Sequence, residues 1–366
     1  MSGNVRSNAR LRRLIWGVWV VSALVWMAGP LMAQEAAPAP SAAPAASKVK
    51  ADSAQMKEVI SRGLDWLVSV QSRSGRWTAN NGEYPTAMTA LAVLALTAEG
   101  STTMQGKYAL PIRHGVDFLL AQSRPNGLIG SQKDSHYTYG HGYAMLALAQ
   151  VLGEEEDIER RQQLVDVLER AVSFTVNAQT KAGGWGYVSA KDGNDFDEGS
   201  TTITQVQGLR ACRNAGIPVP KEAIDKAIQY INRCTHDDGG VQYSSKSGGP
   251  GRPAITAAAV ACLFNAGDYD DKYVPKMLEF CRQNLSDINS SAMGYWHYSH
   301  FYYAQVMYRQ GGEAWDTYSS EIFKKILSEA GENGCWSQGY IGGVYTTAKN
   351  LVILQLDLGN LPIFQR

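Results

Sequence analysis

The acidic run DGNDFDEG, residues 192–199, is the part of this chain best suited to acid–base chemistry. A carboxyl group can act as a general acid when burial or a neighbouring like charge raises its pKa. Asp195 and Asp197 are the candidates for that role. The alternative is a solvated, glycine-bounded loop in which an Asp or Ser caps the helix predicted to begin near Ser200. The sequence favours the helix-capping loop. The role of Asp195 and Asp197 as a general acid stays open as the other hypothesis.

Two histidines three residues apart form a second candidate for chemistry. His297 and His300 would share one face of a helix, which is a spacing that a zinc site can use. The competing interpretation is that both rings pack as aromatic groups beside Tyr298 and Tyr302. We favour packing and expect no bound metal ion.

The composition excludes several function classes. The formal net charge of the 366 residues is zero, which gives no electrostatic reason to expect a nucleic-acid partner. Five cysteines are too few and odd in number for a disulfide framework, so they are expected to be buried thiols. We find no pattern typical of a nucleotide cofactor site or of a Ser-His-Asp triad, and we expect no cofactor.

The first fifty residues have the pattern of an export signal and a tether. Four arginines lie between residues 6 and 13, and residues 14–33 carry no charge. We therefore expect a signal peptide or signal anchor over 1–33, with 14–33 long enough to tether the protein to a membrane. Residues 34–50 are rich in Ala and Pro and predict a disordered linker. We therefore expect an exported protein that is periplasmic or extracellular. A leader that is not cleaved would anchor it in the inner membrane.

An internal repeat of about fifty residues fills the rest of the chain. Each unit begins with an amphipathic helix, continues through a glycine-rich break such as GGWGY (183–187), and ends with a helix rich in small residues, such as TAMTALAVLALTAEG (86–100). The units align on an aromatic residue of the first helix. These residues are Trp66, Phe118, Phe174, Tyr230 and Phe280, with a weaker sixth copy near Ile326.

The two kinds of helix predict a closed double ring. The second helices are apolar nearly all round, so they must be buried on every side, whereas the first helices keep one polar face for solvent. An open stack of such units would need polar end caps, and the sequence shows none. We therefore predict an all-α fold: one α/α toroid of about six helical hairpins over residues 51–366, with an inner and an outer ring.

The stretch RGLDWLVSVQSRSGRW, residues 62–77, carries a family resemblance. It matches the QW motif of squalene and oxidosqualene cyclases, and partial copies stand at 184–187 and 334–336. Residues 55–360 as a whole resemble the terpene cyclase/protein prenyltransferase superfamily, and in particular the bacterial secreted proteins with a prenyltransferase and squalene oxidase repeat.

The resemblance implies a central cavity lined by the starts of the inner helices. The residues it proposes for ligand binding are Tyr84, Tyr137, His141, Arg252, Trp296, His297, His300 and Tyr345. Asp195-Phe-Asp197-Glu198 resembles the Asp-x-Asp-Asp motif from which class II terpene cyclases donate a proton, except that Glu198 replaces the last Asp. A second departure is that this chain supplies one toroid where those cyclases have two or more helical domains. The zinc ligands of the prenyltransferases are not preserved.

Three functional hypotheses follow. The first is an exported or membrane-tethered toroid that binds an apolar isoprenoid-like or peptide ligand in its centre. The second is a terpene cyclase of the class II type that uses Asp195 and Asp197 as its acid. The third is a scaffold that binds proteins through its outer ring.

Overall fold

The structure of this protein is a computed structural model that describes residues 54–365, apart from residue 194 and residues 290–294. The predicted leader (1–33) and linker (34–50) lie outside the described residues. Within the described part of the chain, no helix is both long enough and apolar enough to cross a membrane.

Twelve α-helices make up the described region, and they alternate between two rings. The outer helices are α1 (Ala54–Ser69), α3 (Ala109–Ala121), α5 (Ile158–Ala178), α7 (Lys221–Cys234), α9 (Val274–Leu285) and α11 (Gly312–Ser328). The inner helices are α2 (Pro85–Ala98), α4 (Tyr137–Glu154), α6 (Gly199–Asn214), α8 (Pro253–Ala266), α10 (Trp296–Gln310) and α12 (Gly343–Leu354).

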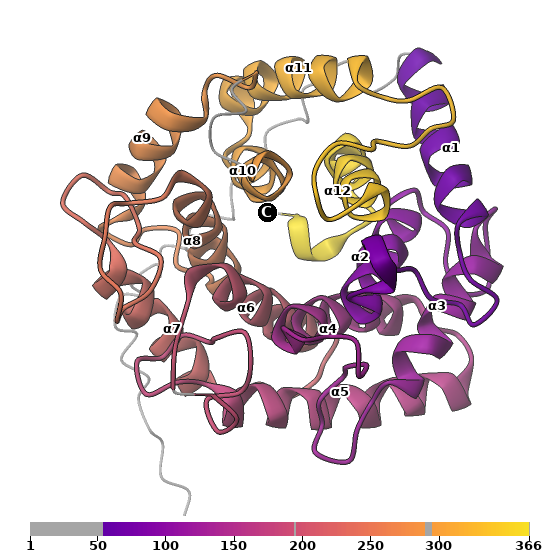
Figure 1. The fold of residues 1–366 in the computed structure, drawn as a ribbon, viewed down its shortest axis with the longest axis horizontal. Coiled ribbons are helices and arrows are strands. Elements are labelled where there is room, and N and C mark those ends of the chain that lie inside the picture. The colour runs from indigo at the N-terminus through magenta and orange to yellow at the C-terminus, as the bar shows by residue number, and fades with distance from the viewer. Residues whose placement is uncertain (1–53, 194, 290–294, 366) are drawn as a thin grey trace, which may run out of the picture. The chain divides into compact units, whose positions relative to one another are not determined.

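The inner helices form a closed ring, with the outer helices surrounding them (Figure 1). Each inner helix packs against the next one along the chain, and α12 packs against α2, which completes the circle. The predicted toroid of six hairpins is therefore confirmed.

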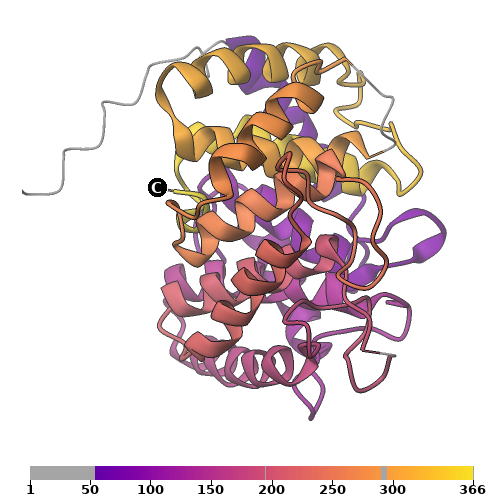
Figure 2. The same cartoon turned by 90° about the vertical axis from the view of Figure 1, so that its left-hand side faces the viewer.

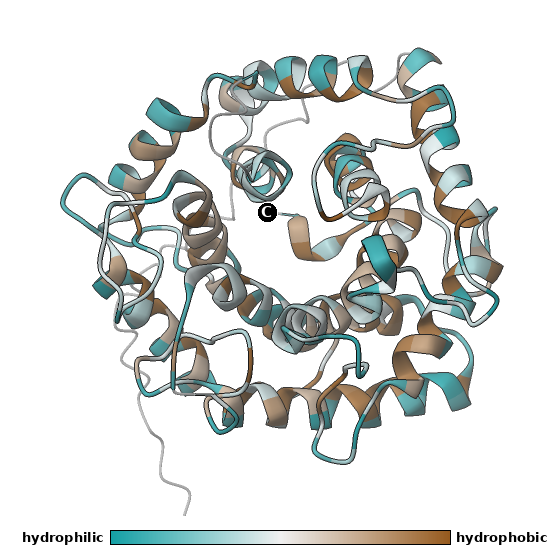
Figure 3. Ribbon diagram, viewed as in Figure 1, coloured by the Kyte–Doolittle hydropathy of each residue, from teal (hydrophilic) through white to brown (hydrophobic). Residues whose placement is uncertain are grey.

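The division into rings follows the distribution of apolar side chains. Every residue of α2 is buried, and α8 is buried from Ile255 to Asn265. The outer helix α7 instead buries one stripe that includes Ala223, Ala227 and Tyr230 and leaves its other face to solvent. Figure 3 shows this alternation of hydrophobic and hydrophilic residues around the outer ring. Small side chains in the inner helices allow close packing on both sides.

A repeated tryptophan joins the two rings. The indole N–H of Trp77 donates to the carbonyl oxygen of Leu67 at 2.7 Å, and Trp185 and Trp336 make the same bond to the ends of α5 and α11. Each of these three indoles is buried. The bonds satisfy carbonyl groups that the end of an outer helix leaves unpaired.

A repeated glutamine adds a second bond at the same junction. Gln71 donates to the carbonyl oxygens of Gly75 and Pro111, and Gln179 makes the equivalent pair of bonds in the third unit. Gln71 and Trp77 of the 62–77 stretch therefore both stabilise the junction between an outer helix and the segment that follows it.

The C-terminal segment closes one end of the inner ring. After α12, the short 3₁₀ helices Leu356–Leu358 and Pro362–Phe364 fold back beneath the inner helices, and Pro362–Phe364 contacts α6 (Figures 1 and 2). Phe364 is buried with its ring at an edge angle to that of Phe301. The centre of the ring therefore has a floor at the C-terminal ends of the inner helices.

All five cysteines are free thiols. Cys212, Cys234, Cys262 and Cys281 are buried, as expected, and burial raises the pKa of each. Burial also raises the pKa of Cys335, which argues against a reactive thiolate there.

Candidate functional site

The candidate site is the centre of the inner ring, on the side of the helix N-termini. Three inner helices place two long side chains there, one helical turn apart, so that both members of each pair lie on the same face. The pairs are Tyr139 and Tyr143 on α4, Tyr298 and Tyr302 on α10, and Tyr345 and Lys349 on α12. We call these six residues the central cluster.

Lys349 is at the deepest point of the central cluster. Its side chain is fully buried, and its Nζ lies 3.7 Å from the centre of the Phe301 ring and 3.2 Å from the Tyr143 hydroxyl oxygen. The rings of Tyr143, Tyr298, Tyr302 and Tyr345 stand within 5.6 Å of the same nitrogen. Among the described residues no carboxylate forms an ion pair with it. Burial lowers the pKa of Lys349 well below its usual value.

Exposure increases from the bottom of the cluster toward the loops that precede the inner helices. Lys349 and Tyr302 are fully buried, Tyr345 and Tyr298 are partly buried, and Tyr340 in the loop before α12 is 73% exposed. The central cluster is thus the buried end of a group of aromatic side chains whose exposure increases toward the loops; we call this group the aromatic recess and its outer tyrosines the rim. The rim residues are Tyr84, Tyr187, Tyr243, Tyr295 and Tyr340.

The phenol groups of the recess take part in two separate sets of hydrogen bonds. The hydroxyls of Tyr143 and Tyr302 are 3.0 Å apart, and the Tyr298 hydroxyl donates to the carbonyl oxygen of Ser200 at 3.3 Å. Tyr139 bonds to the Ser200 hydroxyl. Burial raises the pKa of each of these tyrosines, so all of them are neutral donors at physiological pH.

The two aspartates proposed as acids lie in the loop before α6 and differ in environment. Asp197 is fully buried and accepts three hydrogen bonds: one from the Ser244 hydroxyl at 3.0 Å, and two from the backbone N–H and the hydroxyl of Ser245, each at 2.7 Å. These donors occupy both carboxylate oxygens. Asp197 therefore ties the loop before α6 to the loop before α8.

Asp195 is more open and makes different contacts. Desolvation acts to raise its pKa, but the Lys181 backbone N–H and the Lys246 ammonium outweigh that effect, and its pKa is lowered. Lys246 Nζ lies 3.2 Å from Asp195 Oδ2. A lowered pKa is the opposite of what a general acid needs.

Glu198, the third acidic residue of the run, is the N-cap of α6. Its carboxylate accepts from the backbone N–H groups of Ser200 and Thr201 at 2.9 and 2.6 Å. Burial raises its pKa, and these donors act in the opposite direction. A side chain caps this helix as predicted, but the capping residue is Glu198 and not an Asp or Ser, and Asp197 and Glu198 are buried where a solvated loop was expected.

Two of the predicted ligand-binding histidines lie between the rings. His141 accepts from the Ile129 backbone N–H through Nδ1 and bonds to the Thr175 hydroxyl through Nε2, at 3.1 and 2.9 Å. His300 bonds to the Tyr318 hydroxyl of α11 at 2.9 Å. Burial lowers the pKa of His141 to about 4 and that of His300 to about 3. Both are neutral packing groups that point away from the central cluster.

His297 and Trp296 lie together at the start of α10. His297 Nδ1 is 3.3 Å from the Asn350 side-chain oxygen, and burial lowers its pKa to about 4. The Trp296 indole N–H donates to the carbonyl oxygen of Ile288. Within the described part of the chain, no group of three His, Cys, Asp or Glu residues lies close enough together to hold a metal ion.

The remaining predicted residues are divided between the rim and the recess. Tyr84 bonds to Ser135, and Arg252 lies over the Tyr243 ring at 4.5 Å, so both belong to the rim. Tyr137 donates to Asp192 and accepts from the Ser189 backbone, which holds a loop in place. Tyr345 alone among the eight belongs to the central cluster.

Sequence reasoning did not select Lys349 and Tyr143 as site residues. A signal for both was present, because each follows a tyrosine by four residues on an inner helix. Lys349 is also a charged residue inside the otherwise uncharged stretch that runs from 340 to 356.

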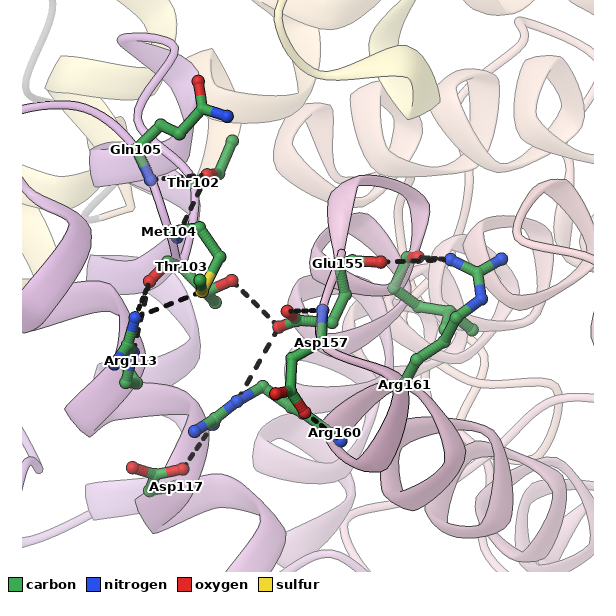
Figure 4. A network of polar contacts seen from close by, with 11 residues as sticks. Thr102, Thr103, Met104, Gln105, Arg113, Asp117, Glu155, Asp157, Arg160 and Arg161 are labelled. Carbon is green, nitrogen blue, oxygen red and sulfur yellow. Dashed lines mark hydrogen bonds and ion pairs between the residues drawn. The ribbon is translucent and has the colours of Figure 1, made fainter.

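The opposite end of the ring has a different character. A cavity of about 340 Å³ lies there between the C-terminal ends of α2 and α4 and the C-terminal segment, lined by hydroxyl and amide groups such as those of Thr97, Gln150 and Asn360. Figure 4 shows the polar network beside it, in which the buried Glu155 carboxylate accepts from Thr103 at 2.9 Å and lies 3.8 Å from Arg160. Because these bonds connect α5 to the loop after α2, the network is structural.

Comparisons with known proteins agree with this architecture. Residues 83–256 match the model of the squalene-hopene cyclase C-terminal domain. Drimenyl diphosphate synthase of Streptomyces showdoensis is 25% identical over 49% of this chain and 30% of its own length. A probable squalene–hopene cyclase of Sinorhizobium fredii is 24% identical over 52% of this chain and 31% of its own. Over this region the chain is similar to proteins of the terpene cyclase superfamily.

Solved structures show the same fold at low sequence identity. The type II terpene cyclase MstE from Scytonema, in complex with geranylgeranyl dihydroxybenzoate, superposes with a TM-score of 0.57 at 13% identity, covering 84% of this chain and 98% of that one. An α-1,6-mannanase from Salegentibacter superposes with a TM-score of 0.61 at 9% identity, covering 83% of this chain and 99% of that one. The recognition of the superfamily is confirmed, while the chain matches only about a third of the length of its curated relatives.

Proposed function

We propose that this domain binds an elongated apolar ligand of the isoprenoid class in its aromatic recess. The observation that carries the proposal is the central cluster together with the rim: neutral tyrosines on three inner helices surround one axis, and their exposure increases steadily toward the loops. Flat aromatic walls with few polar groups suit a hydrocarbon chain.

The relatives support the class of ligand. MstE is described with geranylgeranyl dihydroxybenzoate, and two curated relatives are named as a drimenyl diphosphate synthase and a probable squalene–hopene cyclase. The predicted leader, residues 1–33, leads us to propose that binding takes place outside the cytoplasm, with the domain tethered through residues 14–33.

Class II cyclisation is the second candidate, and the burial of Asp197 is the observation that favours it. The three donors on its carboxylate count against it, because an acid must present its proton to an alkene. Lys349 adds a further difficulty, since a neutral amine in the centre would trap or deprotonate a carbocation. We therefore favour binding without acid-initiated cyclisation.

Titration of the purified full chain with farnesol, a fifteen-carbon isoprenoid alcohol, tests the proposal. We expect saturable binding, measured by calorimetry, that weakens about tenfold in Tyr298→Ala and in Tyr345→Ala, because each removes an aromatic contact worth about 1.4 kcal/mol. Tyr269→Ala is the matched control, since Tyr269 lies in the loop between α8 and α9 and is 43% exposed. Absence of binding, or equal weakening in all three variants, would contradict the proposal.

A further inference from the structure

Lys349 is the only amine in the recess among the residues that the structure describes, and an amine can form a covalent bond with a carbonyl ligand. Its Nζ has a single hydrogen-bonding partner among the described residues, the hydroxyl of Tyr143 at 3.2 Å, and otherwise faces aromatic rings. A buried ammonium ion without a carboxylate partner is costly, so the side chain is held as a neutral amine. A neutral lysine amine is a nucleophile toward carbonyl groups.

Aromatic side chains from three inner helices surround the Lys349 nitrogen. The groups that face its nitrogen are Tyr143 of α4, Tyr298, Phe301 and Tyr302 of α10, and Tyr345 of α12. None of these carries a charge at neutral pH. The floor below is apolar as well, because Phe301 contacts Phe364 of the C-terminal segment.

We infer that Lys349 forms a Schiff base with an apolar aldehyde whose chain occupies the aromatic recess. This inference rests on the proposed function, because it requires the ligand chain to lie along the tyrosines of α10 and α12. The position of Lys349 at the buried end fixes which end of the ligand reacts: the carbonyl group must enter first, and the chain must extend toward the exposed Tyr340.

Imine formation requires only the aldehyde, the Lys349 amine and a proton donor, which Tyr143 supplies. The Lys349 amine attacks the carbonyl carbon to give a carbinolamine, in which a C–N bond has formed and the carbonyl oxygen has become a hydroxyl. Tyr143 donates a proton to that hydroxyl, water leaves, and the nitrogen loses its proton back to the tyrosine as the C=N bond forms. Tyr302, 3.0 Å from Tyr143, stabilises the transient phenolate by a hydrogen bond. The net result is one imine and one water molecule.

Reductive trapping of the full chain tests the inference. The protein is incubated at pH 7 with farnesal, a fifteen-carbon isoprenoid aldehyde, and sodium cyanoborohydride, which reduces an imine to a stable secondary amine, and the modified peptide is identified by mass spectrometry. We expect the adduct on Lys349 to form about tenfold or more faster than on the exposed Lys226 of α7, to be blocked by excess farnesol, and to be absent in Lys349→Met. Thermal melting checks that this variant folds.

Two further measurements separate the possible failures. Tyr143→Phe should slow trapping about tenfold or more while changing farnesol affinity less, because it removes a proton donor and keeps the ring. Farnesol binding without a Lys349 adduct would overturn the inference and leave the proposed function intact, and so would labelling spread evenly over the lysines. Failure of both compounds to bind would remove both proposals.

Discussion

Gly334, in the loop between α11 and α12, packs directly against the backbone of Arg62 in α1, so that the last repeat contacts the first. A Cβ atom added to Gly334 would stand 2.3 Å from the Arg62 carbonyl oxygen, and the backbone there has a φ of +84°. The equivalent glycine of the first repeat, Gly75, makes the same approach to His114 of α3. This contact closes the ring and needs a residue without a side chain.

Gly334→Ala should therefore destabilise the protein by about 3 kcal/mol, because it adds a clash with backbone atoms to the strain of a left-handed residue. Urea unfolding measures the difference. The matched control is Gly216→Ala, since Gly216 has a φ of +88° but no atom within 4 Å of the added Cβ. The control should cost only about 1 kcal/mol. Equal losses of unfolding free energy in the two variants would show that the close contact of Gly334 with Arg62 does not contribute to stability.

Acid should destabilise the protein through its buried histidines. Because burial lowers the pKa of His141 to about 4, the unfolded chain binds a proton that the folded chain does not bind between about pH 6.5 and pH 4. The stabilisation is fully present above pH 6.5 and is lost as the pH falls through that window, by about 3 kcal/mol for His141 alone.

The free energy of unfolding measured at several pH values between 4 and 7 checks this expectation. His141→Asn should flatten the dependence on pH, whereas replacement of the exposed His114 by Asn should leave it unchanged. A slope that His141→Asn does not alter would contradict the assignment.

The two aspartates of the acidic run should contribute unequally to stability. Asp197→Ala leaves the Ser245 backbone N–H and two hydroxyls without their acceptor, and we expect a loss of about 3 kcal/mol. Asp195→Asn breaks a partly exposed ion pair with Lys246 and keeps a residue type that tolerates the left-handed backbone at this position, so it should cost less than about 1 kcal/mol. Chemical denaturation distinguishes the two. A greater loss in Asp195→Asn would be inconsistent with the contacts described above.

Replacement of Lys349 by Met should raise stability by about 2 kcal/mol at pH 7, because an apolar side chain of similar length removes a buried amine without a charged partner. The lowered pKa of Lys349 means that the unfolded chain binds an extra proton up to about pH 10.4, so wild-type stability should rise with pH toward that value. Thermal melting of both proteins between pH 6 and pH 9 tests this. The difference between them should shrink as the pH rises, and a destabilised Lys349→Met would count against a neutral amine at this site.

The sequence by itself determined the repeat, the all-α class and the assignment of helices to two rings. These properties depend on local patterns: one polar face in the first helix of each unit, as in α7, and small apolar residues in the second, as in α2. The helix-joining role of Gln71 and Trp77 was also predictable, because a Gly-rich break that carries a tryptophan recurs after the outer helices α1, α5 and α11.

Only the tertiary structure decided which residues meet at the centre. An inner helix is buried on every side, so its apolar pattern does not distinguish the face toward the centre from the face toward the outer ring. That is why His141 and His300, which begin inner helices, were expected in the recess but bond to α5 and α11 instead. Lys349 and Tyr143 come together from positions 206 residues apart, because closure of the ring sets the rotation of α12 relative to α4.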